Sequence, residues 1–159
     1  MKKIEIKATV EYLQMDELTE EERNLVESAI RATDNSYAKY SNFQVGAAIL
    51  LSDGRVMIGA NQENAVFPVG LCAERTAIFA AQAQFPELSI LKLAIAARNA
   101  KGLMPKPVSP CGSCRQVILE IEERYNQPIR ILLYGTEGIY AVNTVRDLLP
   151  LCFVEGSMM

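Results

Sequence analysis

The chain begins with a regular alternation of apolar and polar residues. Across residues 3–12, every even position is apolar and every odd position is charged or polar. A period of two is typical of a strand with one buried face, so the pattern predicts a strand here. Further along, Thr19 and Glu22 have the spacing of a helix capping box. The apolar residues after them recur on one helical face, which predicts a helix that ends near residue 34.

The rest of the chain alternates between strand-like and helix-like segments. Strands are expected at 43–51, 56–61, 90–97, 129–134 and 139–142, and helices at 73–83, 112–124 and 144–149. The first two strands flank Ser52-Asp53-Gly54, a hairpin signal, and later strands are separated by helices long enough to cross over. This order predicts a single α/β domain over residues 1–159, a three-layer α/β/α sandwich with a mixed central sheet. Residues 1–16 form a strand-like extension to it.

Composition and charge narrow the classes of function. Half of the 159 residues are apolar, the net charge is −3 and the pI is about 5.1. An acidic chain without a long Lys/Arg run is not expected to bind nucleic acid or an anionic membrane. The start of the chain lacks the apolar core of a signal peptide, and no apolar stretch approaches a spanning helix. We therefore expect a cytoplasmic protein, in which clustered cysteines bind metal or do redox work.

Three cysteines carry the candidate chemistry. Cys72 is followed two residues later by Glu74, and Cys111 and Cys114 form a Pro-Cys-Gly-Ser-Cys cluster 39 residues after Cys72. Three thiolates supply three zinc ligands and leave the fourth tetrahedral position open, as a catalytic site requires. The chain contains no histidine to complete the set. The pattern therefore predicts one catalytic Zn²⁺ per chain.

The position of these residues supports the assignment. Each cluster falls where a loop enters a predicted helix, and backbone N–H groups at a helix N-terminus favour thiolates. Glu74 faces the same pocket if Cys72 lies at or before the first helical residue. Three thiolates with one Zn²⁺ carry a net charge of −1, so we expect compensation from Arg75 and Arg115, the neighbours of Glu74 and Cys114, as donors to the sulfurs.

Two other readings of the cysteines stay open. A thioredoxin-like dithiol would account for Cys111 and Cys114 but leaves Cys72 and Glu74 unexplained. A zinc-stabilised interaction module without catalysis needs a fourth ligand, and Cys152 is the one remaining thiol. Because Cys152 stands outside both clusters, we expect it to be a small buried or interface residue.

Five blocks in order resemble the cytidine deaminase family, in its small, all-cysteine zinc form. The resemblance covers residues 19–153, with blocks Phe43-Gln44-Val45-Gly46-Ala47-Ala48, Asn61-Gln62-Glu63-Asn64-Ala65, Cys72-Ala73-Glu74-Arg75-Thr76-Ala77, Pro110-Cys111-Gly112-Ser113-Cys114-Arg115-Gln116 and Asp147-Leu148-Leu149-Pro150. It implies that Cys72, Cys111 and Cys114 bind zinc and that Glu74 shuttles protons. The implied reaction converts cytidine or 2′-deoxycytidine to uridine or 2′-deoxyuridine with release of ammonia, in pyrimidine salvage.

The resemblance also suggests how substrate is held. Asn61 and Glu63, two residues apart at a strand end, project to one face, and an amide with a carboxylate suits the hydroxyls of a ribose. Phe43 resembles an aromatic that packs on the nucleoside, and Phe153 one that reaches a neighbouring subunit's site in a homotetramer. A deaminase of another aminopyrimidine, such as a nucleoside antibiotic, is the alternative. Deaminases of nucleotides, tRNA or DNA usually have histidine in place of the first cysteine.

Overall fold

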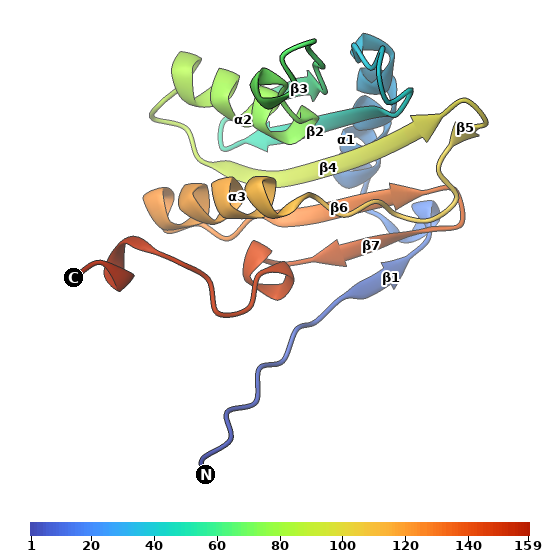
Figure 1. The fold of residues 1–159 in the computed structure, drawn as a ribbon. Helices are drawn as coiled ribbons and strands as arrows, with labels where there is room; N and C mark the ends of the chain where they lie inside the picture. The colour runs from blue at the N-terminus through green and yellow to red at the C-terminus, as the bar shows by residue number, and fades with distance from the viewer.

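The computed structural model describes residues 1–159 as one mixed sheet with helices on both faces (Figure 1). The strands are β1 (Glu11–Leu13), β2 (Gln44–Leu51), β3 (Val56–Ala60), β4 (Ile90–Asn99), β5 (Gly102–Leu103), β6 (Arg130–Gly135) and β7 (Gly138–Val142). The α-helices are α1 (Glu20–Ala32), α2 (Ala73–Gln84) and α3 (Gly112–Tyr125). The strand order is β1-β7-β6-β4-β2-β3, with the short β5 paired to β4. Only β4 and β6 are parallel, and the other pairs are antiparallel.

Two cores, one on each face of the sheet, confirm the expected three-layer sandwich. Along β2, Ile49 and Leu51 point into the core with α2 and α3, whereas Ala48 and Leu50 point into the core with α1. The same alternation runs along the buried part of β4, which explains why its sequence is a continuous apolar run. The crossover helices α2 and α3 lie on the same face in Figure 1, so their N-termini can meet. No helix is both long enough and apolar enough to cross a membrane.

The first helix begins where its capping box predicts. Thr19 is the N-cap, its hydroxyl accepts a hydrogen bond from the Glu22 amide at 3.2 Å, and the Glu22 carboxylate accepts one from the Thr19 amide at 3.1 Å. The short helix expected at 144–149 is a 3₁₀ turn, Val145–Leu148, whose N-cap is Thr144. The side chains of Thr19 and Thr144 therefore fix where α1 and the 3₁₀ turn begin.

The strand expected at 3–12 is much shorter than its pattern. Only Glu11–Leu13 pairs with β7, and residues 1–10, here called the N-terminal arm, are extended and exposed without a strand partner. The reason is the length of β7: the pairing of Glu11 with Ala141 would bring Val10 opposite Val142, the last residue of β7. In Figure 1 the arm leaves the sheet and points away from the body of the molecule.

Candidate metal centre and active site

The three cysteines of the two sequence clusters lie together at the N-termini of α2 and α3. Cys72 is the N-cap of α2, Cys111 is the N-cap of α3, and Cys114 lies in the first turn of α3. All three Sγ atoms are within 4.8 Å of one another, and those of Cys72 and Cys111 are 3.9 Å apart. Neither cap cysteine uses its sulfur to cap its own helix, so the sulfurs are available to one another.

The donor set fits a zinc ion. Tetrahedral Zn–S bonds of about 2.3 Å place two sulfurs roughly 3.8 Å apart, which agrees with the separation of the Cys72 and Cys111 Sγ atoms. The cluster contains three protein donors and no fourth. All four cysteines of the chain are free, so no disulfide competes for these thiols. The arrangement is that of a catalytic zinc site with one position left for water or substrate.

Cys72 ionises more readily than an ordinary thiol. Hydrogen bonding from Cys114, with further help from Arg75 and Cys111, lowers the pKa of Cys72 to about 5. The same contact with Cys72, together with burial, raises the pKa of the Cys114 thiol. Arg75 lies one turn after Cys72 and its guanidinium donates to Cys72 Sγ at 3.4 Å. The contact places positive charge against the thiol cluster and raises the pKa of Arg75.

Glu74 is buried beside the thiols. Only 4% of its surface is exposed, and it lies in the first turn of α2, as the N-cap position of Cys72 permits. Burial raises the pKa of its carboxyl group, and the neighbouring Cys72 thiolate acts in the same direction. Glu74 is not a member of the cluster that could hold the metal. A carboxylate next to a metal centre, and free of it, is suited to proton transfer.

Arg115 does not donate to a sulfur, as was expected from its position after Cys114, but to two backbone carbonyls. Its Nε donates to the Pro110 carbonyl at 2.9 Å and its Nη1 to the Leu148 carbonyl at 2.5 Å, and no hydrogen bond reaches a sulfur. Arg115 follows Cys114 on α3, so its side chain turns back along the loop that precedes the helix. It therefore fastens the residue before Cys111 to the Val145–Leu148 3₁₀ turn, and Arg75 is the guanidinium that donates to the clustered sulfurs.

A cavity of about 290 Å³ opens beside Cys72, Cys111 and Glu74. Its other lining residues are Ser41, Phe43, Val45, Asn61, Ala73, Ile95, Val108 and Ser109. A second cavity of about 460 Å³ shares Ser41, Asn61 and Cys72 with it and extends outward past Tyr40, Gln62, Glu63, Asn64, Phe67, Gly70 and Leu71. No Lys or Arg lines either cavity. The pair offers a small apolar chamber at the thiols and a wider vestibule that carries the polar side chains of Asn61 and Glu63.

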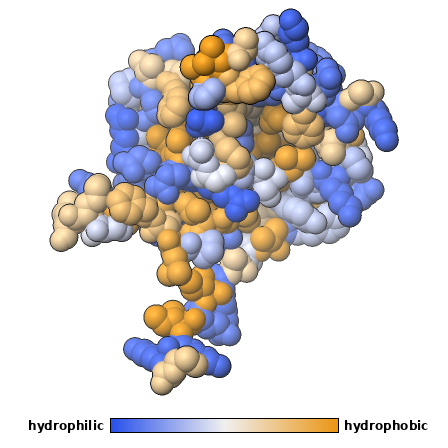
Figure 2. All heavy atoms as spheres, in the orientation of Figure 1, coloured by the Kyte–Doolittle hydropathy of each residue, from blue (hydrophilic) through white to orange (hydrophobic).

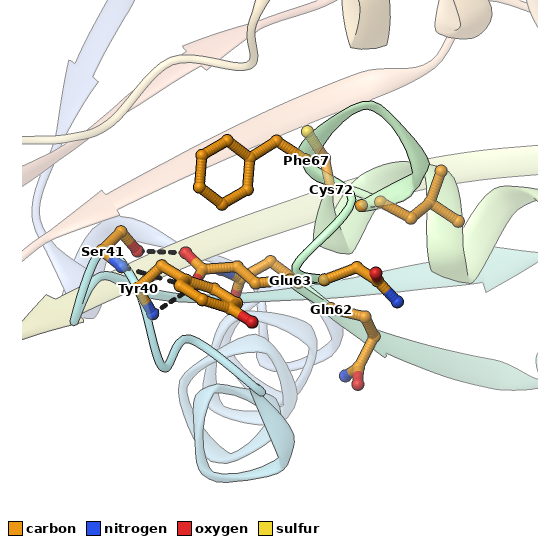
Figure 3. Close-up of a pocket in the computed structure, with 10 residues that line it drawn as sticks. Tyr40, Ser41, Gln62, Glu63, Phe67 and Cys72 are labelled. Carbon is orange, nitrogen blue, oxygen red and sulfur yellow. Dashed lines mark hydrogen bonds between the residues drawn. The ribbon is translucent and has the colours of Figure 1, made fainter.

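Asn61 and Glu63 both line the vestibule, and both hold the loop before β2. The Asn61 amide donates to the Phe43 carbonyl at 2.9 Å and accepts from the Val45 amide at 2.8 Å. Its oxygen also accepts from the Ser36 hydroxyl at 2.5 Å. Figure 3 shows the Glu63 side chain turned toward Tyr40 and Ser41 of that loop, with dashed lines for its hydrogen bonds.

Glu63 is bound to the loop by three donors. It accepts from the Tyr40 amide at 2.7 Å, from the Ser41 amide at 3.2 Å and from the Ser41 hydroxyl. These contacts, the Ser41 hydroxyl first, lower the pKa of Glu63. The sequence pointed to Asn61 and Glu63 but not to their partners Ser36 and Ser41. Each serine lies more than twenty residues before the side chain that it contacts.

Phe153 and Cys152 of the C-terminal tail lie outside the thiol cluster. Phe153 is exposed and lines a separate hollow with residues of α3 and the tail, and its carbonyl accepts from Gln116 at 2.9 Å. Cys152 is half-buried near Arg146, outside the metal cluster.

Ser109 lines the inner cavity and is a further residue that was not predicted from the sequence. Its place directly before Pro110-Cys111 could have signalled it.

Known sequences similar to this chain are cytidine deaminases. The profile described as the cytidine and deoxycytidylate deaminase zinc-binding region matches residues 19–126. A cytidine deaminase of Halalkalibacterium halodurans is 39% identical over 134 residues, covering 84% of this chain and 95% of the relative. One from Sporosarcina psychrophila is 40% identical, over 84% of this chain and 92% of the relative. The N-terminal arm and β1 precede the region of the profile.

Solved structures agree with the sequence comparisons. The cytidine deaminase of Burkholderia pseudomallei superposes with a TM-score of 0.70 at 36% identity, covering 86% of this chain and all of the other. That of Mycobacterium tuberculosis gives 0.64 at 32% identity, covering 82% and 95%. The region matched by the profile, residues 19–126, contains Cys72, Cys111 and Cys114. The chain therefore belongs to the cytidine and deoxycytidylate deaminase family of zinc-binding proteins.

Proposed function

We propose that this protein catalyses the hydrolytic deamination of cytidine and 2′-deoxycytidine, consuming one water and releasing ammonia, in pyrimidine salvage. One observation carries the proposal: three thiols lie within 4.8 Å of one another, and two of them, Cys72 and Cys111, line the same small cavity as the buried carboxylate of Glu74. Membership of the deaminase family supports the choice of reaction.

In this proposal Cys72, Cys111 and Cys114 hold one Zn²⁺. When bound, the ion lowers the pKa of water and so supplies a nucleophile at neutral pH. Arg75 offsets the negative charge of the thiolates through its contact with Cys72 Sγ. Glu74 takes a proton from the attacking water and delivers protons to N3 of the pyrimidine and to the departing amine. Its burial keeps bulk water from competing for that carboxylate.

The two cavities suit a nucleoside. The apolar inner chamber, with Phe43 in its wall, accepts the pyrimidine, and the vestibule with Asn61 and Glu63 accepts the sugar. The second N–H of Asn61 and the free lone pairs of Glu63 can bond ribose hydroxyls while both side chains keep their contacts with the loop. Because the linings contain Glu63 and no Lys or Arg, a 5′-phosphate has no basic partner there.

Three further parts of the proposal concern the whole chain. Residues 1–159 act as a single domain, with residues 1–16 as a strand-like N-terminal extension. The active form is a homotetramer, in which the exposed Phe153 reaches the vestibule of a neighbouring subunit. Four free cysteines suit a reducing compartment, and we assign the protein to the cytoplasm on that ground.

The test is direct. We expect the purified protein to contain one zinc per chain and to convert cytidine and 2′-deoxycytidine with release of one ammonia per base. Cytidine 5′-monophosphate should be a poor substrate. One zinc per chain without deamination of either nucleoside would overturn the proposed reaction, and efficient turnover of the monophosphate would overturn the assignment of the vestibule.

A further inference from the structure

The N-terminal arm has the sequence of a strand and no strand beside it. Ile4 is 82% exposed, Ile6 51% and Val10 50%, and they alternate with charged or polar residues. Figure 2 shows apolar residues along the segment that projects from the body of the molecule. An extended segment with free backbone groups on both edges and an apolar face is a template for pairing with another chain.

The arm continues an edge strand of the sheet. It leads directly into β1, whose Tyr12 packs against Tyr140 of β7 with ring centroids 5.6 Å apart. Tyr12 is on the same face as Ile4, Ile6 and Val10 by strand alternation. A strand that paired with the arm would therefore extend an existing sheet, which gives it more support than an isolated two-stranded ribbon has.

We propose that the arm pairs antiparallel with the arm of a second copy of this chain, about a two-fold axis at Ile6. This register pairs residues 2–10 of both copies. Ile6 then faces Ile6 of the partner subunit, and Ile4 faces Ala8 of the partner subunit. Glu5 faces Lys7 of the partner subunit, and the symmetry repeats this pair of opposite charges on the other side of the axis. Opposite charges and β-branched pairs directly across a ladder stabilise it.

Charge disfavours three neighbouring registers. An axis at Glu5 or at Lys7 would place two identical charges opposite each other, and an axis at Ala8 would oppose Glu5 to Glu11. An axis at Ile4 also pairs opposite charges, but it uses only residues 1–7 and leaves Val10 unpaired. Within one chain Lys7 Nζ already lies 3.6 Å from the Glu5 carboxylate on the same side of the strand. The paired arms bring four alternating charges together there.

A second copy of the chain is the expected partner of the arm, because arm-to-arm pairing gives a closed dimer. The same segment supplies both sides, so two chains satisfy each other and the assembly stops. The exposed edge strand β3, with Val56 and Ile58 exposed, is the other surface to which an arm could add. That contact joins two different surfaces, so it closes only through a ring or a reciprocal exchange of arms, whereas arm-to-arm pairing closes with a single contact. No residue of the arm lines either cavity of the active site, so the pairing is independent of the proposed function.

Disulfide trapping in the zinc-loaded full chain tests the pairing and its register. Ile6→Cys places one new thiol on the two-fold axis, where Cβ atoms of facing residues are about 5 Å apart. Thr9→Cys is the matched control, because its two copies would be separated by six residues of strand, roughly 20 Å. Under mild oxidation we expect disulfide-linked dimers of Ile6→Cys and no more for Thr9→Cys than for the unaltered chain.

Charge reversal in the Ile6→Cys background gives a second, directional test. Glu5→Lys or Lys7→Glu alone makes both symmetric pairs repulsive, and we expect trapping to slow by about tenfold. The double variant Glu5→Lys with Lys7→Glu restores opposite charges and should restore the rate. Zinc content and turnover of cytidine should be unchanged in every arm variant. Equal trapping of Ile6→Cys and Thr9→Cys, or a double variant no faster than the single ones, would overturn the proposal.

Discussion

A Cβ atom added to Gly59 would lie 2.3 Å from the carbonyl oxygen of Ala73, the first residue of α2. The same atom would lie 2.5 Å from the Ala77 amide, also in the first turns of this helix. Both contacts are with backbone, which cannot turn aside as a long side chain can. The absence of a side chain at Gly59 in β3 therefore sets how closely α2 approaches the sheet, and with it the position of Cys72 and Glu74.

Gly59→Ala should move the N-terminus of α2 away from β3. Overpacking of this kind typically costs about 1–3 kcal/mol, and the displaced helix carries a thiol and the carboxylate. We expect a lower free energy of unfolding, measured by denaturation, together with reduced zinc content and turnover. Gly156→Ala is the control, because a Cβ there meets no atom within 4 Å. Wild-type zinc affinity in Gly59→Ala would show that the close approach does not position the site.

Glu74→Gln should keep the metal and lose most of the activity. The amide fills nearly the same buried space but cannot accept and return a proton, and general acid–base catalysis contributes about 10²–10⁴ in rate. Zinc per chain should stay at the wild-type value, and kcat for cytidine should fall by at least the lower of those factors. Glu87→Gln, an exposed carboxylate beyond the end of α2, is the control and should change neither quantity. A Glu74→Gln enzyme with near-normal kcat would remove the proton-transfer role.

The sequence predicted the three-layer fold and the cluster of thiols because the signals for both are local. Caps, hairpin residues and apolar periods mark the elements, and Cys72 and Cys111 sit at helix N-caps that a reader of the sequence can place. The contacts of Asn61 and Glu63 were not predictable in this way. Their partners Ser36, Tyr40 and Ser41 lie 22–25 residues earlier, in a loop without regular pattern.

Two other features also depended on distant residues. The alternating pattern of residues 3–12 predicted a strand over this whole stretch. Pairing begins only at Glu11, because its partner strand β7, more than a hundred residues later in the chain, ends at Val142. Arg115 was expected at the sulfurs from its position after Cys114. Its contacts with the Pro110 and Leu148 carbonyls follow from how the Val145–Leu148 turn packs on α3, which no spacing in the sequence indicates.

Arg75→Gln tests charge compensation at the thiols. Arg75 donates to Cys72 Sγ, and Arg115 makes no contact with a sulfur, so Arg75 is the one guanidinium that offsets the cluster's negative charge. Loss of such a contact typically costs 10–100-fold in activity or metal affinity. We expect turnover to fall within that range while most of the zinc is retained, with partial recovery in Arg75→Lys. Equal turnover in Arg75→Gln and the wild type would sink the idea.

Glu63→Gln should act mainly on the binding of substrate. The change removes the negative charge of Glu63, which accepts hydrogen bonds from three donors of the Tyr40–Ser41 loop. It also makes the side chain a weaker acceptor for the sugar hydroxyls. We expect KM for cytidine to rise by about tenfold, the cost of one weakened hydrogen bond to a charged group, with a smaller change in kcat. Ser41→Ala separates the two effects, because it disturbs the loop contact and leaves the carboxylate for the sugar. A fall in kcat alone in Glu63→Gln would contradict a role in binding.

The buried carboxylate of Glu22 should stabilise the fold in a pH-dependent way. Burial alone would raise the pKa of Glu22, but hydrogen bonds from the Thr19 amide and the Arg130 guanidinium, together with the charge of Lys92, lower it below the usual 4.5. The Arg130 contact is 2.7 Å long and the Lys92 Nζ lies at 3.7 Å. Because the unfolded chain then binds this proton more tightly than the folded one, the contribution is present above pH 4.5 and is lost as pH falls below it.

The Glu22→Gln variant isolates that contribution. At neutral pH its free energy of unfolding should be lower by roughly 1–3 kcal/mol, since Arg130 and Lys92 lose a buried charged partner. Between pH 5 and pH 3 the difference from the wild type should shrink, because the wild-type carboxyl becomes protonated as well. Glu27→Gln on the same helix removes an exposed pair with Arg31, whose atoms are 3.8 Å apart, and should cost little at any pH. A Glu22→Gln deficit that stays constant down to pH 3 would mean that the carboxylate stabilises α1 through packing and not through its charge.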